Sequence, residues 1–387
     1  FGSRLALAVG PAAPIRPCAA MAPTVRQRAA SPGGPRQGAA PAAEKPADAA
    51  KGQSSPQPVD KSKAPPVESS SGSGLGLPFW IALLCLTQIA MFIYTKRAAQ
   101  KAALPLSICL AQFAVSACLT AMASALPGTG WNGLRWMKKE QRQHLVPLGI
   151  VWSLAFVLLT ASIASMSAAL AGVVRSTEPL VSVALGLAAG ERYSLPVLAA
   201  LVPVCAGVVL ASHGGGSLTL AGVALAVFSN FGFSARPFLA RRLRSQPGEK
   251  LDEIGTFFHV TCIATVLLLL AAGLVEGGQL LPTAQRLDAA GEGGRFLGDV
   301  LLSSVSFFLY QFAQLVVMSR LNPLTFSVLT PVSKASMIVA CALYFGDPFG
   351  ASNALGVGIS TAGVLLFSAA KRRADGQKAK AAAGKAE

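Results

Sequence analysis

Ten apolar segments follow one another between residues 78 and 370, and most of them contain no ionisable side chain. Each is long enough, or nearly so, to cross a hydrocarbon layer about 30 Å thick. Backbone polar groups in lipid must be satisfied within their own segment, so each segment is predicted to be a helix. The approximate spans are 78–95, 104–126, 145–163, 167–188, 194–212, 218–239, 254–275, 298–318, 322–345 and 349–370. The predicted fold class is therefore an all-α membrane protein with ten transmembrane helices.

Composition excludes the common soluble classes. Only 13% of the residues are charged, against roughly 25% in a typical soluble domain, and 52% are hydrophobic. The net charge of +16 would by itself suit nucleic acid or anionic lipid. The cations, however, lie mostly near the termini and in short loops, with few aromatic residues among them. We therefore expect membrane lipid, and no nucleic acid, as a partner.

No motif in the chain indicates catalysis or metal binding. The seven cysteines include no CxxC pair and no Cys/His cluster at ligand spacing. Neither a Walker A motif nor an HExxH motif occurs, and no Ser/His/Asp constellation is recognisable. The prediction is that the chain is not an enzyme and has no catalytic residues, no cofactor and no metal.

The two ends of the chain differ from the apolar middle. Residues 1–76 are rich in Ala, Pro, Ser and Gly, and five arginines precede the first acid, Glu44. This composition is typical of an organellar transit peptide. The alternative is a disordered leader without an address. Residues 371–387 form a second basic segment, which we interpret as a tail.

Loop charges predict the orientation of the spans. With the N-terminus placed on side A, the loops of that side contain ten Lys and Arg residues. The loops of the opposite side contain five, which are Lys96, Arg97, Lys101, Arg286 and Arg295. Because positive loops stay on the cytoplasm-equivalent side of a membrane, side A is predicted to face that compartment. An even number of spans places both termini there.

An internal repeat is visible at an offset of 156 residues. The Gly-Glu pair at 190–191 matches the Gly-Asp pair at 346–347, and the Ala-Gly-Val triplet at 206–208 recurs at 362–364. The fourth and fifth spans therefore resemble the ninth and tenth. Each half has an odd number of spans, so the halves have opposite orientations, as in many transporters.

The repeat defines the predicted domain organisation. Residues 77–212 form the first five-helix repeat, and residues 218–370 form the second. In inverted repeats of this kind, the binding site lies near the bilayer midplane between the halves. The alternative is that apolar helices resemble one another by chance.

Ionisable residues inside the spans indicate where that site is. Arg175 and Glu178 lie in the fourth span, Arg236 in the sixth, His259 in the seventh and Lys334 in the ninth. A cation at the bilayer centre costs about 2.5–3.5 kcal/mol on insertion scales, so such residues are kept for a function. An inverted repeat would bring Arg175 and Lys334 to one central cavity. Converging cations there would bind an anion, and Arg offers two-pronged hydrogen bonding to phosphate or carboxylate.

Each of these residues also has a structural interpretation. Arg175 and Glu178 are three residues apart on one helix face and could neutralise each other. Arg236 could extend to the membrane interface. His259 is expected to be a satisfied interhelical histidine. Lys334 has no partner nearby in the sequence, which favours a functional role for it.

Three stretches of the chain resemble a known family. Residues 172–179 look like the "IKAxEP" stretch of the plastidic sugar-phosphate/phosphate translocators, and residues 229–236 look like their "SNxxFxxR" stretch. Residues 310–334 resemble the segment that runs from "YNQ" through "APLT" to "KR". The resemblance covers about residues 78–370 in the same order. It points to the drug/metabolite transporter superfamily, whose members have ten helices in two inverted halves.

The resemblance implies a function and a set of binding residues. Family members exchange inorganic phosphate for phosphorylated metabolites across the inner plastid envelope, so triose phosphate or another sugar phosphate is the expected substrate, and the termini are expected in the stroma. The implied substrate-binding residues are Arg175, Arg236, Tyr310, Ser333 and Lys334. Two alternatives stay open: a nucleotide-sugar transporter of the Golgi or endoplasmic reticulum, and, from another class, a membrane-embedded transferase.

Two positions depart from the family pattern. Ser333-Lys334 stands where the family has adjacent Lys and Arg, so one cation is lost. Phe156 falls where the family has a His of the third helix. These departures leave the identity of the phosphorylated metabolite open.

Overall fold

The computed structural model describes residues 76–125, 139–213, 218–244, 253–321 and 323–383. All of them belong to one compact unit, residues 71–387. The predicted leader, apart from Gly76, and residues 126–138 therefore lie outside the described residues, as does the end of the predicted tail.

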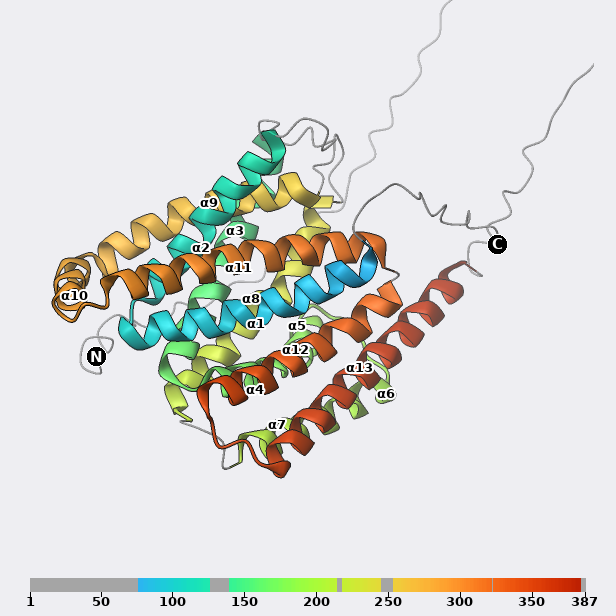
Figure 1. The fold of residues 1–387 in the computed structure, drawn as a ribbon. Helices are drawn as coiled ribbons and strands as arrows, with labels where there is room; N and C mark the ends of the chain where they lie inside the picture. The colour runs from blue at the N-terminus through green and yellow to red at the C-terminus, as the bar shows by residue number, and fades with distance from the viewer. Residues whose placement is uncertain (1–75, 126–138, 214–217, 245–252, 322, 384–387) are drawn as a thin grey trace, which may run out of the picture. The chain divides into compact units, whose positions relative to one another are not determined.

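The described residues contain helices and no strand (Figure 1). Ten candidate membrane spans are present among them, which confirms the predicted all-α membrane fold. Span four consists of α4 and α5, and span five of α6 and α7. The helices are α1 (Leu77–Lys101), α2 (Pro105–Ala125), α3 (Lys139–Ser165), α4 (Ala168–Arg175), α5 (Glu178–Ala188), α6 (Leu195–Ala199), α7 (Leu201–Ser212), α8 (Leu220–Arg244), α9 (Glu253–Val275), α10 (Gly277–Ala289), α11 (Gly293–Arg320), α12 (Pro323–Phe345) and α13 (Ala351–Ala383).

Several helix boundaries differ from the sequence prediction. Helix α1 continues to Lys101, so Lys96 and Arg97 lie in the helix and not in a loop. Helix α13 continues to Ala383, so the tail predicted from residue 371 is helical up to that point. Helix α10 was not predicted at all. Its sequence is too polar for a membrane span, and hydropathy alone gives no other signal for a helix there.

Proline explains the two interrupted spans. Pro179 is the second residue of α5; it has no N–H to bond the carbonyl of Arg175, and its ring would clash with that carbonyl in a continuous helix. The chain therefore leaves the helix at Ser176 and Thr177, between α4 and α5. In span five, Pro203 has no N–H to bond the carbonyl of Ala199, and the helix is interrupted at Ala200.

The helix ends gather at two ends of the bundle. The C-terminal part of α1 contacts the C-terminal end of α3, the N-terminal part of α11 and the C-terminal end of α12. We call this the α10 end, because α10 packs there between α9 and α11. At the opposite end, here the tail end, Tyr193 packs against the C-terminal part of α13. Figure 1 shows α10 and the last turns of α13 at opposite ends of the bundle.

The repeat inferred from the sequence has a local structural counterpart. Gly190 and Gly346 both have positive φ, +82° and +65°, and each ends a membrane span. The following residue bonds back in both cases: Glu191 N–H donates to Gly186 O at 2.8 Å, and Asp347 N–H donates to Ala342 O at 3.0 Å. Both turns have the six-to-one bond of a Schellman cap. One cap lies at each end of the bundle.

Helix neighbours are reciprocal between the two predicted halves. Span one packs most extensively on span eight (α1 on α11), and the counterpart pair, spans six and three, packs almost as extensively (α8 on α3). Spans two and eight are neighbours, and so are spans seven and three. Spans two and seven, four and nine, and five and ten pack directly on each other. A two-fold relation between the halves requires this reciprocity, so the packing supports the two predicted repeats.

The seam between α7 and α13 depends on small residues. A Cβ atom built on Gly207 would meet the backbone of Gly356 and Ser360, and one on Gly363 would meet the backbone of Val204. Small residues of this kind let helix backbones approach closely in lipid. The contact between Gly207 and Ser360 and the contact between Val204 and Gly363 are related by the 156-residue offset, so the seam itself follows the repeat.

Candidate functional site

The interruption in span four is held by side chains of α8. Asn230 is fully buried, and its Nδ2 donates to Val174 O at 3.3 Å and to Thr177 Oγ1 at 3.1 Å. Ser234 Oγ donates to Glu178 O at 3.3 Å. These bonds tie α8 to both sides of the break, at the end of α4 and at the start of α5. They also fix the positions of the two charged residues that flank the break, Arg175 and Glu178.

Glu178 pairs with a cation from the other predicted half. Lys334 Nζ lies 2.7 Å from Glu178 Oε2, and the two side chains are 20% and 27% exposed. The sequence offered Arg175 as the neighbour for this carboxylate and no partner for Lys334, but the direct ion pair is between Glu178 and Lys334. The two residues are 156 positions apart. This separation equals the offset of the predicted repeat.

Both arginines lie on aromatic rings. The guanidinium carbon of Arg175 is 3.8 Å from the centroid of the Phe233 ring, and that of Arg236 is 3.8 Å from the centroid of the Trp152 ring. Such cation–π contacts contribute about 0.5–2 kcal/mol each. The Nε of Arg175 is buried and has no hydrogen-bond partner among the described residues. Aromatic faces hold the two cations without neutralising them.

Phe156 packs against the rings of Phe233 and Trp152. It is 4% exposed and contacts Phe233 edge-to-face, with ring centroids 5.0 Å apart and an interplanar angle of 88°. Its ring centroid is 6.5 Å from that of Trp152 and 4.9 Å from that of Phe307. The family pattern has a histidine at this position. In this chain a phenylalanine packs there against the two rings that contact Arg175 and Arg236.

The charged residues act on one another. Glu178 interacts electrostatically with Lys334, Arg175 and Arg236. The hydroxyl of Tyr310 interacts with both arginines and with Glu178. The structure thus brings together four of the five residues expected to bind substrate, around one carboxylate. The four residues and this carboxylate, Glu178, are here called the central cluster: Arg175, Glu178, Arg236, Tyr310 and Lys334. Within the cluster, three cations face one carboxylate, an excess of two positive charges, and Glu253 of α9, outside the cluster, also acts on Arg236.

A cavity of about 270 Å³ opens beside the central cluster, between α5, α12 and α13. Glu178 and Lys334 form part of its wall, and both apolar and hydroxyl side chains form the rest, including Phe326, Ser327, Thr330 and Phe367. A smaller hollow shares Phe326 and Thr330 with it and is lined by Tyr310 and Ser333. Arg175 and Arg236 line neither of these two spaces.

Ser333 differs from the other expected residues because its hydroxyl already has a partner. The side chain is 3% exposed and donates to the Oε1 atom of Gln88 on α1. Gln88 was not singled out in the sequence, where the available signal was one long polar side chain in an apolar span. The bond ties α12 to α1 next to Lys334.

His259 lies on α9 with its ring next to that of Phe258, at a centroid distance of 5.5 Å, and it lines neither space of the central cluster. Among the described residues, no group of three or more His, Cys, Asp or Glu side chains is placed to hold a metal ion.

Comparison with known proteins decides the family. The model of the Triose-phosphate Transporter family matches residues 75–368 of this chain. The chain belongs to the triose-phosphate transporter family. The matched range covers the central cluster and nearly all of the ten spans.

Three relatives of this chain are named as chloroplastic translocators. The chain is 31% identical to phosphoenolpyruvate/phosphate translocator 1, chloroplastic, of Oryza sativa subsp. japonica, over 74% of this chain and 70% of that protein. It is 30% identical to phosphoenolpyruvate/phosphate translocator 1, chloroplastic, of Arabidopsis thaliana, over 77% and 72%. It is 29% identical to the triose phosphate/phosphate translocator, non-green plastid, chloroplastic, of Brassica oleracea var. botrytis, over 79% and 76%.

Proposed function

We propose that this chain is an antiporter that exchanges inorganic phosphate for a phosphorylated metabolite, of the triose phosphate or phosphoenolpyruvate size, across the inner plastid envelope. The observation that carries the proposal is the central cluster, in which three cations surround one carboxylate at the interruption of span four. A phosphate ester has a charge of about −1.5 to −2 at pH 7, which matches the excess of positive charge. The names of the relatives supply the phosphate/metabolite pairing.

The mechanism that we propose is alternating access. The two repeats, residues 77–212 and 218–370, move relative to each other around the central cluster, and the bound anion neutralises Arg175, Arg236 and Lys334. Without the anion, the excess positive charge would have to be enclosed in a low-dielectric interior. An enclosed charge costs at least about 2.5 kcal/mol, and about 1.4 kcal/mol corresponds to a factor of ten in rate. The empty carrier is therefore expected to reorient tens of times more slowly than the loaded one.

We also propose a location for the chain on the same basis. The relatives are chloroplast proteins by name, and the leader has the composition of a transit peptide. The excess of loop cations on the side of both termini is consistent with a stromal position for the termini. The inner envelope is the membrane that this topology would suit.

Exchange can be tested with the purified chain in liposomes. Liposomes preloaded with phosphate should take up labelled phosphate at least ten times faster than liposomes without internal phosphate, because only the loaded carrier returns readily. A panel of internal anions, which includes triose phosphate, phosphoenolpyruvate and hexose phosphate, identifies the counter-substrate. Equal uptake with and without an internal anion would contradict the exchange mechanism.

The aromatic support of Arg175 can be tested separately. Phe233→Leu removes the ring under the guanidinium, so the KM for phosphate is expected to rise between two- and thirtyfold, which corresponds to about 0.5–2 kcal/mol. Phe231→Leu is the matched control, because Phe231 lies on the same helix and is 41% exposed. Initial exchange rates at several phosphate concentrations give both KM values. If both substitutions leave KM unchanged, the ring does not position Arg175 for binding.

A further inference from the structure

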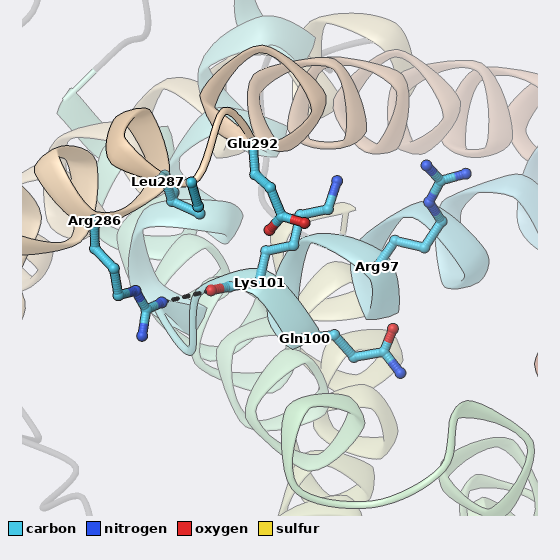
Figure 2. A pocket seen from close by; sticks show the side chains of 7 residues that line it. Arg97, Gln100, Lys101, Arg286, Leu287 and Glu292 are labelled. Atoms are coloured by element: carbon cyan, nitrogen blue, oxygen red, sulfur yellow. Dashed lines mark hydrogen bonds between the residues drawn. The ribbon is translucent and has the colours of Figure 1, made fainter.

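A second basic cavity lies at the α10 end of the bundle. Its volume is about 510 Å³, and none of its lining residues lines the cavity at the central cluster. Arg97, Gln100 and Lys101 of α1 form one side, and Arg286 of α10 and Glu292 form the other. Figure 2 shows these side chains around the opening, with Arg286 reaching across to the end of α1. We call it the α10 pocket.

The cations of the α10 pocket are held in place by the protein. Asp299 of α11 is 3% exposed; it accepts a hydrogen bond from Lys101 Nζ at 2.8 Å and forms an ion pair with Arg97, whose Nε lies 3.1 Å from Asp299 Oδ1. Arg97 Nη1 also donates to the Tyr344 hydroxyl at 3.0 Å. Arg286 Nη2 donates to the backbone oxygen of Lys101 at 2.7 Å, drawn as a dashed line in Figure 2. Each cation is thus oriented before any ligand arrives.

These bonds leave donors unused. A guanidinium has five N–H groups and an ammonium has three, and the contacts above use one or two of them for each residue. None of the ion pairs found among the described residues includes Arg286. The pocket therefore contains one cation without a carboxylate partner and two whose remaining N–H groups are available. Several converging donors of this kind suit the oxygens of a phosphate group.

The charges around the α10 pocket also favour an anion. Arg97, Lys101 and Arg286 contribute three positive charges, and Asp299 and Glu292 contribute two negative ones. The balance is one positive charge, so binding should be weaker than at the central cluster. Among the described residues, Glu292 forms no ion pair with these cations, and its carboxylate would repel a bound anion. This opposing charge gives the site a distinctive response to mutation.

We propose that the α10 pocket is a second anion site, separate from the central cluster, that binds a phosphate group through Arg97, Lys101 and Arg286. The group can come from free phosphate or a phosphorylated solute, or from the headgroup of an anionic lipid. The lipid source is relevant because Leu280 and Leu281, which precede Arg286 on α10, are 41% and 67% exposed. The chemistry of recognition is the same for both sources.

The first test measures binding of labelled inorganic phosphate to the purified full-length chain by equilibrium dialysis. The Lys334→Gln background weakens the central cluster, so the remaining binding reports the α10 pocket. In that background, Arg286→Gln should weaken binding two- to fivefold, which corresponds to about 0.4–1 kcal/mol for a solvent-accessible charge. Glu292→Gln should strengthen binding by a similar factor. Opposite signs from two neighbouring residues would not result from a general loss of structure.

Arg295→Gln is the matched control. Arg295 lies on α11 in the same region, is exposed, and does not line the pocket. If Lys334→Gln fails to fold, the Arg286 and Glu292 substitutions are made in the otherwise unchanged chain, where they should alter the weaker of two binding steps. The readout is binding and not transport, so its result is independent of whether exchange is observed.

The second test addresses the lipid source. The chain is reconstituted in phosphatidylglycerol or in phosphatidylcholine, and retained lipids are counted by native mass spectrometry. Retention of a phosphatidylglycerol by the unchanged chain and by Arg295→Gln, but not by Arg286→Gln, supports the site with a lipid headgroup as its ligand. Phosphate binding with the expected signs supports it with a soluble ligand. If neither phosphate binding nor lipid retention responds to Arg286→Gln and Glu292→Gln, the proposal is wrong.

Discussion

Replacement of Lys334 by Gln is expected to reduce phosphate exchange at least a hundredfold. The substitution removes one of the three cations of the central cluster and leaves the carboxylate of Glu178 without its partner at 2.7 Å. A hydrogen bond to a charged group contributes about 1.5–3 kcal/mol, and the unpaired carboxylate would in addition repel the anion. The measurement is the initial rate of phosphate exchange in preloaded liposomes, normalised to the amount of folded protein.

A double-mutant comparison separates two roles of Lys334. If Lys334 serves only to neutralise Glu178, then Glu178→Gln combined with Lys334→Gln should restore exchange, because neither charge remains. If Lys334 binds the anion, the double variant should recover only the part of the loss that the unpaired carboxylate causes, and its exchange rate should stay well below half that of the unchanged chain. We expect the second result. Recovery of more than half of the exchange rate in the double variant would assign Lys334 a structural role and contradict the proposed site.

Replacement of Gly207 by Val is expected to lower the unfolding temperature strongly. A Cβ at this position would meet backbone atoms of Gly356 and Ser360 on α13, which cannot move aside as a flexible side chain would. Overpacking of this kind costs about 1–3 kcal/mol, and more where backbone must shift. We expect little folded protein, and a clearly lower unfolding temperature for the fraction that folds, measured by the thermal unfolding of the detergent-solubilised chain.

Gly273→Val on α9 is the control for this prediction. No atom lies within 4 Å of a Cβ built on Gly273, so the substitution adds the same β-branched side chain to a helix without a steric conflict. Similar unfolding temperatures for the two variants would show that the α7–α13 seam tolerates a larger separation, and would weaken the case for close packing between the predicted repeats.

The most informative sequence signals were the restrictions that a lipid bilayer places on each segment. A span must be about 20 residues long and apolar, so hydropathy located the ten spans. A charge within such a span is costly, and that cost directed attention to Arg175, Arg236 and Lys334. The 156-residue repeat predicted that Gly190 and Gly346 are equivalent, and both end a membrane span with the same cap. These are properties of single segments or of matched positions, which a linear sequence records.

The sequence did not predict which side chains meet between helices. The sequence favoured Arg175 as the partner of Glu178 because the two are neighbours on one helix, but the carboxylate pairs with Lys334 of another helix. Phe156 was a departure from a pattern, and its place beneath the rings that support the two arginines became visible only in the packed bundle. Helix α10 was missed because a polar surface helix has no hydropathy signal.

The sequence by itself therefore determined that this chain is a ten-span membrane protein with cations inside its bilayer segments, because a 30 Å layer of hydrocarbon restricts each segment on its own. The tertiary structure decided which charges pair, which aromatic rings hold the arginines and where the cavities lie. Those features depend on how helices far apart in the chain rotate and pack against one another, and helix periodicity does not specify the side chain that a residue will meet on its neighbour.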